Sequence, residues 1–328
     1  MAFVPVAIDP AAVSDLAAEF ATLDQDVHRA HKFAIESLRN PRPPEPTILW
    51  HYTNAEGLLG IIKGNELWMS HIATMNDSEE YLHGLQYILD EVDDRLSKTP
   101  LEVPKQFYQK VAEAVNSLMK IEKIPDIYVM SFSGETDTLM HWTEYGRHGV
   151  GYAIGFDAER LKAATANTSD PIRSPILLRC IYADNLKRSI TAAVLDRYLE
   201  ELLQTIASGS DTEGQIARFL QWFIFTAVLF GPSFKHAIFE PECEWRLVAF
   251  DRQAGSSVDY QARGNEVREI VKLSIGEGRN PAMSEIKIGS NRDKRLRKIG
   301  AEVIKRLLNA QELGHVIVAE SMSPYRSP

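Results

Sequence analysis

The stretch from Leu49 to Ser70, LWHYTNAEGLLGIIKGNELWMS, predicts a strand, a short helix and a second strand. Its first apolar run ends in polar residues, a pattern typical of a buried strand that reaches the edge of a core. Asn54 is a suitable N-cap for the helix, and Gly64-Asn65 is a typical helix end. Both predicted strands end in polar side chains, which often border ligand sites: His51, Thr53 and Ser70.

The composition is that of an ordinary globular protein. The chain has 328 residues, of which 45% are hydrophobic and 25% charged, enough for one large domain or two small ones. Its apolar runs fall short of the ~20 residues that a transmembrane helix needs. Met1–Pro5 lacks the basic and apolar regions of a signal peptide. We therefore expect a cytoplasmic protein without a membrane partner, in which Cys180 and Cys243 are free thiols.

The net charge of −9 argues against extensive nucleic-acid binding. One segment is an exception, because residues 287–305 carry seven bases and few acids. A solvated helix face is the simpler interpretation of this segment. A patch that contacts phosphate is the alternative.

Residues 11–39 predict one long amphipathic helix. Its apolar residues recur at alternating spacings of three and four, a heptad-like seam: Val13, Leu16, Phe20, Leu23, Val27, Ala30 and Ala34. The proline-rich residues 41–46 follow as an extended linker. We accordingly divide the chain into an N-terminal helix with its linker, 1–46, and a single domain, 47–328. The helix either docks on its own domain or pairs with a second copy to form a homodimer.

The order of predicted elements indicates an α+β fold, because strands and helices do not alternate regularly. Residues 186–230 are mostly helical and predict a helical insertion. The chain then becomes rich in strands, with a hairpin predicted around Gly264-Asn265. A last helix is predicted over roughly 292–309.

The opening stretch also resembles the start of the ADP-ribosyltransferase fold, in which a strand ending His-x-Thr/Ser precedes an x-x-x-Leu-x-x-Ile-x-x-Gly helix. Most of the chain after about residue 45 is similar to a large, mostly bacterial family known only as a domain of unknown function (DUF 2971). This similarity rests on residues 75–79, 130–133, 139–146, 155–156, 234–235, 242–247 and 323–326. The resemblance implies an ADP-ribosyltransferase-like split β-sheet core with flanking helices.

Two glutamates, Glu242 and Glu244, open a predicted strand. Strand alternation would put both carboxylates on one face, where they repel and one pKa is expected to rise. A solvated strand edge is the simpler interpretation. The pair also resembles the acidic motif of ADP-ribosyltransferases, whose second Glu stabilises the oxocarbenium-like transition state. This resemblance makes Glu244, deeper in the strand, the main catalytic candidate, with Glu242 facing the acceptor.

The same resemblance implies a binding site for NAD. In it, His51 would bond a ribose hydroxyl and act with the glutamates in catalysis. Tyr52, Thr53 and Ser70 would line the pocket. Tyr81 or Tyr145 would stack on nicotinamide, although core packing is the simpler role for either tyrosine. The possible partners of the pyrophosphate are Arg246, Lys235 and Arg263.

Three functional hypotheses follow. The first is an NAD-dependent ADP-ribosyltransferase or NAD glycohydrolase; the resemblance suggests a toxin or phage-defence effector, and the acceptor could be protein, nucleic acid or a small molecule. The second is a non-enzymatic nucleotide-binding or sensor protein of the same fold. The third is a nuclease. We predict no metal site, because the sequence has no H-E-x-x-H or C-x-x-C motif.

Overall fold

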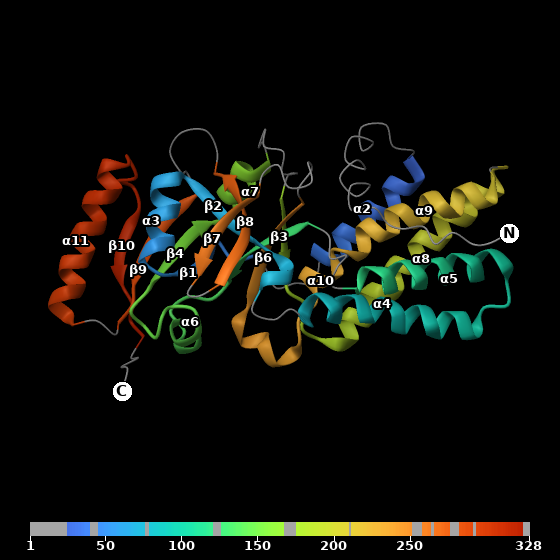
Figure 1. The fold of residues 1–328 in the computed structure, drawn as a ribbon, viewed down its shortest axis with the longest axis horizontal. Coiled ribbons are helices and arrows are strands. Elements are labelled where there is room, and N and C mark those ends of the chain that lie inside the picture. The colour runs from blue at the N-terminus through green and yellow to red at the C-terminus, as the bar shows by residue number, and fades with distance from the viewer. Residues whose placement is uncertain are drawn as a thin grey trace.

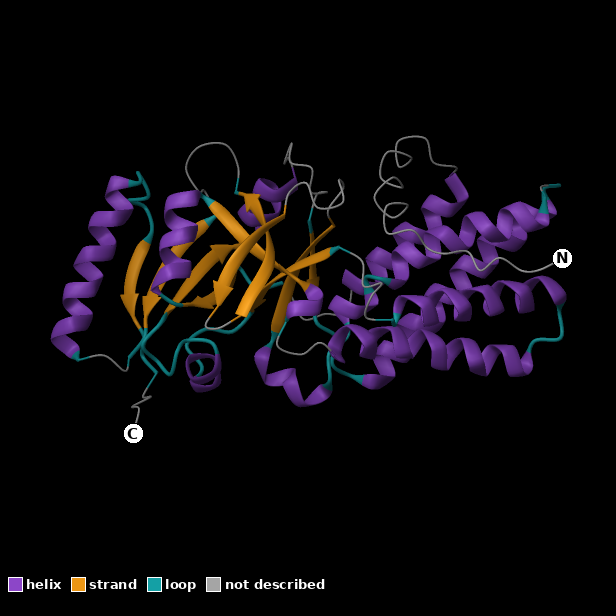
Figure 2. Cartoon of the chain, in the orientation of Figure 1, coloured by secondary structure: helices purple, strands orange, loops and turns teal. Residues whose placement is uncertain are grey.

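The predicted α+β class is confirmed. A computed structural model describes residues 25–39, 45–75, 79–120, 126–166, 175–209, 211–250, 258–263, 266–275, 282–290 and 293–323. Within these residues the chain forms ten α-helices and a ten-stranded, mostly antiparallel sheet. Figures 1 and 2 show the strands gathered in one half of the molecule and the longer helices mostly in the other.

The strands are β1 (Ile48–Thr53), β2 (Glu66–His71), β3 (Ile127–Ser133), β4 (Tyr152–Asp157), β5 (Ile176–Arg179), β6 (Glu244–Phe250), β7 (Val258–Arg263), β8 (Glu266–Ser274), β9 (Met283–Ile288) and β10 (Ile317–Glu320). The α-helices are α2 (Gln25–Arg39), α3 (Ala55–Gly64), α4 (Glu79–Lys98), α5 (Glu102–Leu118), α6 (Leu139–Glu144), α7 (Ala158–Ala166), α8 (Asp184–Ala207), α9 (Thr212–Ala227), α10 (Phe230–Ser233) and α11 (Lys294–Ala310). Two short 3-10 helices also matter for the site, η2 (Ile72–Thr74) and η4 (Ala237–Glu242).

The opening motif folds as its sequence predicts, into β1, α3 and β2. The Asn54 side chain accepts a hydrogen bond from the Gly57 amide at 2.8 Å and so caps α3. Asn65 ends the helix in the left-handed conformation, with φ of 52°. The predicted hairpin is confirmed as the antiparallel pair β7 and β8, although its turn residues Gly264-Asn265 lie outside the described residues.

The sheet divides at β3. The main path runs β10-β9-β4-β1-β3-β2-β8-β7, and β6, with β5 beyond it, pairs along the whole other edge of β3. On the divided edge, β1 meets β3 at Ser133, whereas β2 meets it at Tyr128 and Val129. Between these points, the described registers pair residues 130–132 with β6 but with neither β1 nor β2. The two arms of the sheet therefore separate over the middle of β3.

Two hydrophobic cores share the central strands. Alternate residues of β3 face opposite sides, so that Ile127 and Val129 join one core while Tyr128 and Met130 join the other. The first core fills the helical half and the second lies under α3 and α11. β6 is consequently buried at all seven positions. A charged residue on β6 is therefore almost completely removed from solvent and needs partners inside the protein.

The helical half is assembled from three separate parts of the chain: α2, the α4–α5 pair and α8–α10. The predicted insertion at 186–230 corresponds to α8 and α9. The part of the predicted N-terminal helix that is described, α2, packs on these two helices with Ala30, Ala34 and Leu38 fully buried. This part follows the docking alternative; residues 1–24 and 40–44 lie outside the described residues.

One segment of the helical half, Thr212–Ser233, is long and apolar enough to cross a membrane by length and composition. The segment contains charged residues, Glu213 and Arg218, so it is not the continuous apolar run that the sequence expectation concerned. In addition, 78% of its apolar window is buried inside the protein, as in the core helix of a globular fold. Its hydrophobicity is thus explained by the first core.

Two glycines let α4 and α10 approach closely. A Cβ added at Gly84 would lie 2.4 Å from the carbonyl oxygen of Phe230, and one added at Gly231 would lie 2.3 Å from the Tyr81 ring. Both distances are far below van der Waals contact. This close approach places the start of α4 beside the residues that follow α10, where the charged site described below is built.

We predict that Gly84→Ala destabilises the fold by about 1–3 kcal/mol, because the new methyl group overpacks against backbone. An open helix position would instead gain about 1 kcal/mol from the same change. Gly300→Ala in α11 is the matched control, since a Cβ there meets no atom within 4 Å. Urea titrations of both variants measure the difference. Equal effects at the two positions would contradict the close approach.

Candidate functional site

A cavity of about 410 Å³ opens where β1 and β2 separate over β3. Its size is within the usual range for a small-molecule site. Its walls combine aromatic rings with charged groups. The rings are those of Trp50, Tyr52, Trp68, Phe132, Tyr145 and Phe239, and the charged residues are Glu80, Lys235, Glu242, Glu244, Arg246 and Arg268.

Most of the residues predicted to form the site line this one cavity. They come from β1, β2, the end of α6, η4 and β6, and are His51, Tyr52, Ser70, Tyr145, Glu242, Glu244 and Arg246. The prediction that His51, Tyr52, Ser70 and Glu244 converge is therefore confirmed. The chemical roles assigned to them remain predictions.

Two predicted residues lie elsewhere. Tyr81 is 1% exposed in the first core, where its ring packs against Gly231, and burial raises the pKa of its hydroxyl well above the ordinary value. It is on a face of α4 that does not border the cavity. The Thr53 hydroxyl lies beside Gly57 at the start of α3, outside the cavity lining. Of the two tyrosines considered for stacking on a ligand, the structure therefore places only Tyr145 at the cavity.

His51 is oriented by the division of the sheet. Its Nδ1 atom lies 3.0 Å from the carbonyl oxygen of Ser131, in the part of β3 that pairs with neither arm. A carbonyl oxygen can only accept, so Nδ1 carries the proton and Nε2 carries the lone pair of the neutral ring. The ring also contacts Phe132 edge-on, with centroids 6.1 Å apart. These contacts fix one ring orientation at the cavity wall.

The two glutamates converge by a route that the sequence did not predict. Glu242 is the last residue of η4, and only Glu244 belongs to β6. Cys243 between them adopts the left-handed conformation, with φ of 45°. The predicted strand alternation is therefore wrong for this pair. Both carboxylates nevertheless reach the Lys235 Nζ atom, at 2.5 Å from Glu242 and 2.7 Å from Glu244.

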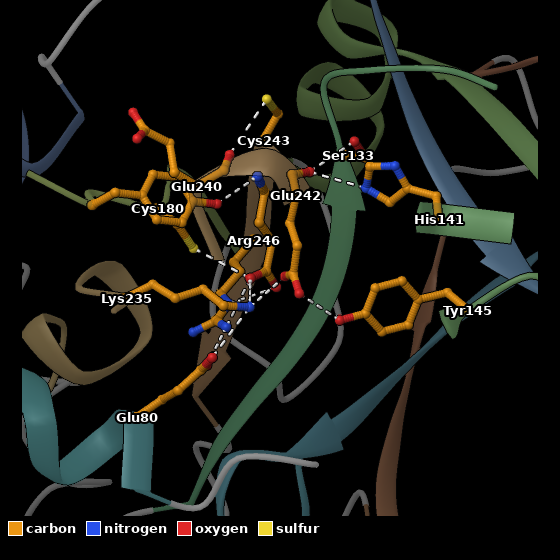
Figure 3. A network of polar contacts seen from close by, with 12 residues as sticks. Glu80, Ser133, His141, Tyr145, Cys180, Lys235, Glu240, Glu242, Cys243 and Arg246 are labelled. Atoms are coloured by element: carbon orange, nitrogen blue, oxygen red, sulfur yellow. Dashed lines mark hydrogen bonds and ion pairs between the residues drawn. The ribbon is translucent and has the colours of Figure 1, made fainter. Parts of the chain in front are cut away.

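Lys235 and Arg246 hold three glutamates in one buried network (Figure 3). Lys235 also lies 3.1 Å from Glu80 on α4. Arg246 donates to both Glu244 oxygens, at 2.8 and 2.9 Å, and to Glu80. Each of the five residues is at most 8% exposed. With all groups ionised, three negative and two positive charges leave a net charge of −1, so the network is close to neutral.

The network sets the ionisation of Glu244. Burial alone would raise the pKa of this carboxyl, but Arg246 and Lys235 outweigh burial and hold the pKa at about 2. The expectation that one of two repelling carboxyls has a raised pKa therefore fails for Glu244. The sequence did not predict the two cations that lie beside the acids and lower this pKa. Burial would likewise lower the pKa of Lys235, but the Glu244 and Glu80 carboxylates raise it above its ordinary value.

Glu242 is positioned by three further groups. The Tyr145 hydroxyl donates to its Oε1 atom at 2.8 Å. Its backbone carbonyl accepts from the Ser133 hydroxyl at 2.9 Å and from His141 Nε2 at 3.1 Å. Burial lowers the pKa of His141, which favours the neutral ring, and that ring stacks on Tyr52 with centroids 5.0 Å apart. The Glu242 side chain is therefore placed on the cavity wall by groups from β3 and α6.

Several residues of the site were not identified from the sequence. His141 belongs to a segment that carries the family resemblance and Glu80 directly follows another, but nothing in their spacing links them to Glu242 or Arg246. Lys235 and Arg246 were expected to contact phosphate, yet both are occupied by carboxylates. Arg268 on β8 also lines the cavity. Arg263, the third cation considered, has a side chain outside the described residues.

One cluster has metal-ligand side chains. Atoms of His71, Asp126 and Glu269 lie within 4.8 Å of one another. However, the Ala73 amide donates to His71 Nδ1 at 3.2 Å, which puts the proton of the neutral ring on Nε2. His71 Nε2 then faces Asp126 at 4.0 Å as a donor rather than a metal ligand. The geometry therefore favours pairing between the ring and the carboxylates over coordination.

A central part of the chain, from α6 to β6, is similar to a known family. Residues 141–247 match the model of a family described as Protein of unknown function (DUF2971). The predicted resemblance to this family is confirmed over that range, which is narrower than expected. The DUF2971 segment runs from α6 to β6 and supplies His141, Tyr145, Lys235, Glu242, Glu244 and Arg246. No curated protein and no solved structure matches the chain.

The ion network predicts a specific acid sensitivity. The pKa of Glu244 is lower in the folded protein than in the unfolded chain, so its stabilisation is complete above about pH 4.5 and is lost as pH falls toward 2. Over this window the free energy of unfolding should fall by about 3 kcal/mol from this group alone. Glu244→Gln should be less stable at pH 7 by about 3–5 kcal/mol, because Arg246 loses its main partner.

Urea titrations of both proteins between pH 7 and pH 2.5 test this effect. The difference in unfolding free energy between wild type and Glu244→Gln should shrink as the pH falls through the window. A difference that stays constant with pH would show that the Glu244 charge does not stabilise the fold. A role for Glu244 in stability was not predicted from the sequence.

Proposed function

We propose that the cavity binds NAD and that the protein breaks the bond between nicotinamide and ribose. The ADP-ribose is then transferred either to an acceptor or to water. The observation that carries this proposal is the presence of His51 and Glu242 on the walls of one aromatic-lined cavity of about 410 Å³. This pairing of a strand-end histidine with an acidic motif is the combination that the resemblance to ADP-ribosyltransferases implies.

In this mechanism the protein stabilises positive charge on the sugar. The bond from ribose C1′ to the nicotinamide nitrogen breaks, and its electron pair neutralises the pyridinium ring of the leaving nicotinamide. The sugar then carries the developing charge, which a nearby carboxylate stabilises in a site of low dielectric. Water or an acceptor hydroxyl adds to C1′ and gives up a proton. His51, whose ring is oriented by the Ser131 carbonyl, would form a hydrogen bond with a ribose hydroxyl.

The ion network favours Glu242 over Glu244 as the charge-stabilising carboxylate, which reverses the roles expected from the sequence. Both oxygens of Glu244 bond Arg246, and one also bonds Lys235, so its charge is largely compensated. Glu242 has one cationic contact, at Oε2, and a neutral tyrosine hydroxyl at Oε1. We assign Glu244 to positioning Lys235 and Arg246. Arg268 is our candidate for the NAD phosphates, because it lines the cavity from β8 and is not one of the two cations, Lys235 and Arg246, that bind the glutamates of the network.

We predict that Glu242→Gln lowers the rate of NAD cleavage by on the order of a hundredfold, because it removes charge while keeping shape. Nicotinamide release, followed by liquid chromatography, measures the rate. Glu240→Gln is the matched control, since Glu240 is an exposed residue of the same 3-10 helix. Full activity in Glu242→Gln with unchanged stability would remove Glu242 from the mechanism.

A second function is favoured by the near-neutral charge of the network. A site whose acids are already paired can recognise a nucleotide without reacting, as in a non-enzymatic binding or sensor protein. The two functions predict different results for wild-type protein incubated with NAD. An enzyme consumes NAD at a measurable rate. If the protein is instead a sensor, NAD raises its melting temperature and remains intact.

Binding can also be tested separately from cleavage. His51→Ala should weaken NAD binding by about tenfold, the scale of one or two lost hydrogen bonds, with little change in melting temperature of the free protein. Isothermal titration of NAD into Glu242→Gln, with and without His51→Ala, measures binding while cleavage is slow. Unchanged affinity would mean that His51 does not contact the nucleotide.

A further inference from the structure

The helix α11 has a wider apolar surface than its packing uses. Ile304 and Leu308 are buried in the second core and attach the helix to the sheet. Three large aliphatic residues on another face are left in solvent: Leu296 at 59%, Ile299 at 51% and Val303 at 57% exposed. Their spacing of three and then four residues makes a continuous stripe along the helix.

This exposed stripe has the form of a helix-pairing seam. Spacings of three and four are those of the contact positions in a two-helix coiled coil. Gly300 borders the stripe, and a Cβ placed there would meet no atom within 4 Å. A partner backbone can therefore approach α11 closely along this side.

The charge of α11 indicates what kind of partner fits. The helix carries six bases, Lys294, Arg295, Arg297, Lys298, Lys305 and Arg306, and one acid, Glu302. Its charge is therefore 6 − 1 = +5, in a chain whose total is −9. Arg295 and Arg306 are both exposed beside the stripe. The complementary partner is an acidic segment with a heptad-like apolar seam.

The chain itself contains such a segment. Residues 9–24 hold four acids, Asp9, Asp15, Glu19 and Asp24, and no lysine or arginine. Their apolar residues follow the same alternating spacing: Val13, Leu16, Phe20 and Leu23. This segment lies outside the described residues. The continuation of its seam is already used in α2, where Ala30 and Ala34 are buried against the helical half.

We propose that the exposed stripe of α11 binds residues 9–24 of a second copy of this chain. The apolar seams would meet, and the acids beside one would face the bases beside the other. A second copy is favoured because residues 9–24 join α2 directly, and α2 and α11 lie in opposite halves of the molecule (Figure 1). In a two-fold dimer, residues 9–24 of each copy bind α11 of the other, so the exposed stripe is covered in both copies.

Sedimentation velocity on the full chain tests the dimer. We expect a species of about twice 36.9 kDa whose dissociation constant rises with salt. Deleting residues 1–24 should give a monomer that keeps α2 and its packing. A full-length chain that is monomeric at tens of micromolar, or a dimer that survives the deletion, would overturn the proposal.

Charge reversal tests the pairing itself. Arg295→Glu with Arg306→Glu should raise the dissociation constant at least tenfold, as should Glu19→Lys with Asp24→Lys. Combining all four changes should restore most of the affinity, because opposite charges face each other again. Failure of this rescue would overturn the proposed pairing. Lys63→Glu with Lys120→Glu, which changes exposed bases elsewhere, is the control and should leave the dimer unchanged.

An uncharged variant gives an independent result. Leu296→Ser with Ile299→Ser removes apolar surface that the free molecule exposes, so its folding should be unaffected while dimerisation is lost. Hydrogen exchange of α11 distinguishes binding between copies from binding within one. If deletion of residues 1–24 deprotects α11 in a chain that is monomeric throughout, the segment binds its own copy and the second-copy proposal is wrong.

Discussion

The structure depends on accommodating Arg246, a guanidinium in the middle of a strand that is buried from end to end. A charge in that position must be paired and hydrogen-bonded, or the fold cannot form. Its partners come from three elements: Glu244 from its own strand, Glu80 from the start of α4, and the carbonyl of Pro232 from α10. This requirement ties the sheet to the helical half at one point, and Lys235 joins the same partners from the segment after α10.

The second constraint is the division of the sheet over β3. A continuous sheet would fill the space between β1 and β2 with backbone hydrogen bonds and leave no room for a ligand. Because the arms separate, the Ser131 carbonyl turns to the His51 ring, and aromatic side chains from both arms line the opening. The ion network closes one side of this opening. Site and fold therefore arise from the same two features, the split sheet and the buried charges.

Local patterns in the sequence predicted local structure well. The β1-α3-β2 motif, with its caps at Asn54 and Asn65, follows from short-range rules, as does the helical character of 186–230. Convergence of β1, β2 and β6 on one cavity was also foreseen, through resemblance rather than physics. The first prediction concerns residues that are close in sequence as well as in space. The second concerns distant residues that belong to a recurring motif.

Other features depend on contacts that no sequence pattern records. The residue type of Tyr81 does not show whether it packs in a core or faces a ligand, and its burial against Gly231 is a contact between distant segments. Glu80, one of the partners of Arg246, lies 166 residues before it in the sequence. The conformation of Cys243 could not be read from residue type, because left-handed geometry favours glycine, asparagine and aspartate. Each miss is a tertiary contact that overrides a local expectation.

The assembly of the helical half from three distant segments has a consequence for how the chain folds. Arg29 on α2 pairs with Glu201 on α8, 172 residues later, so α2 cannot reach its final packing until most of the chain has been synthesised. Until then its buried face must stay in solvent or with a chaperone, and contacts of such long range slow folding. The helical half should accordingly complete its packing late in folding, together with long-range strand pairs such as β2 with β8.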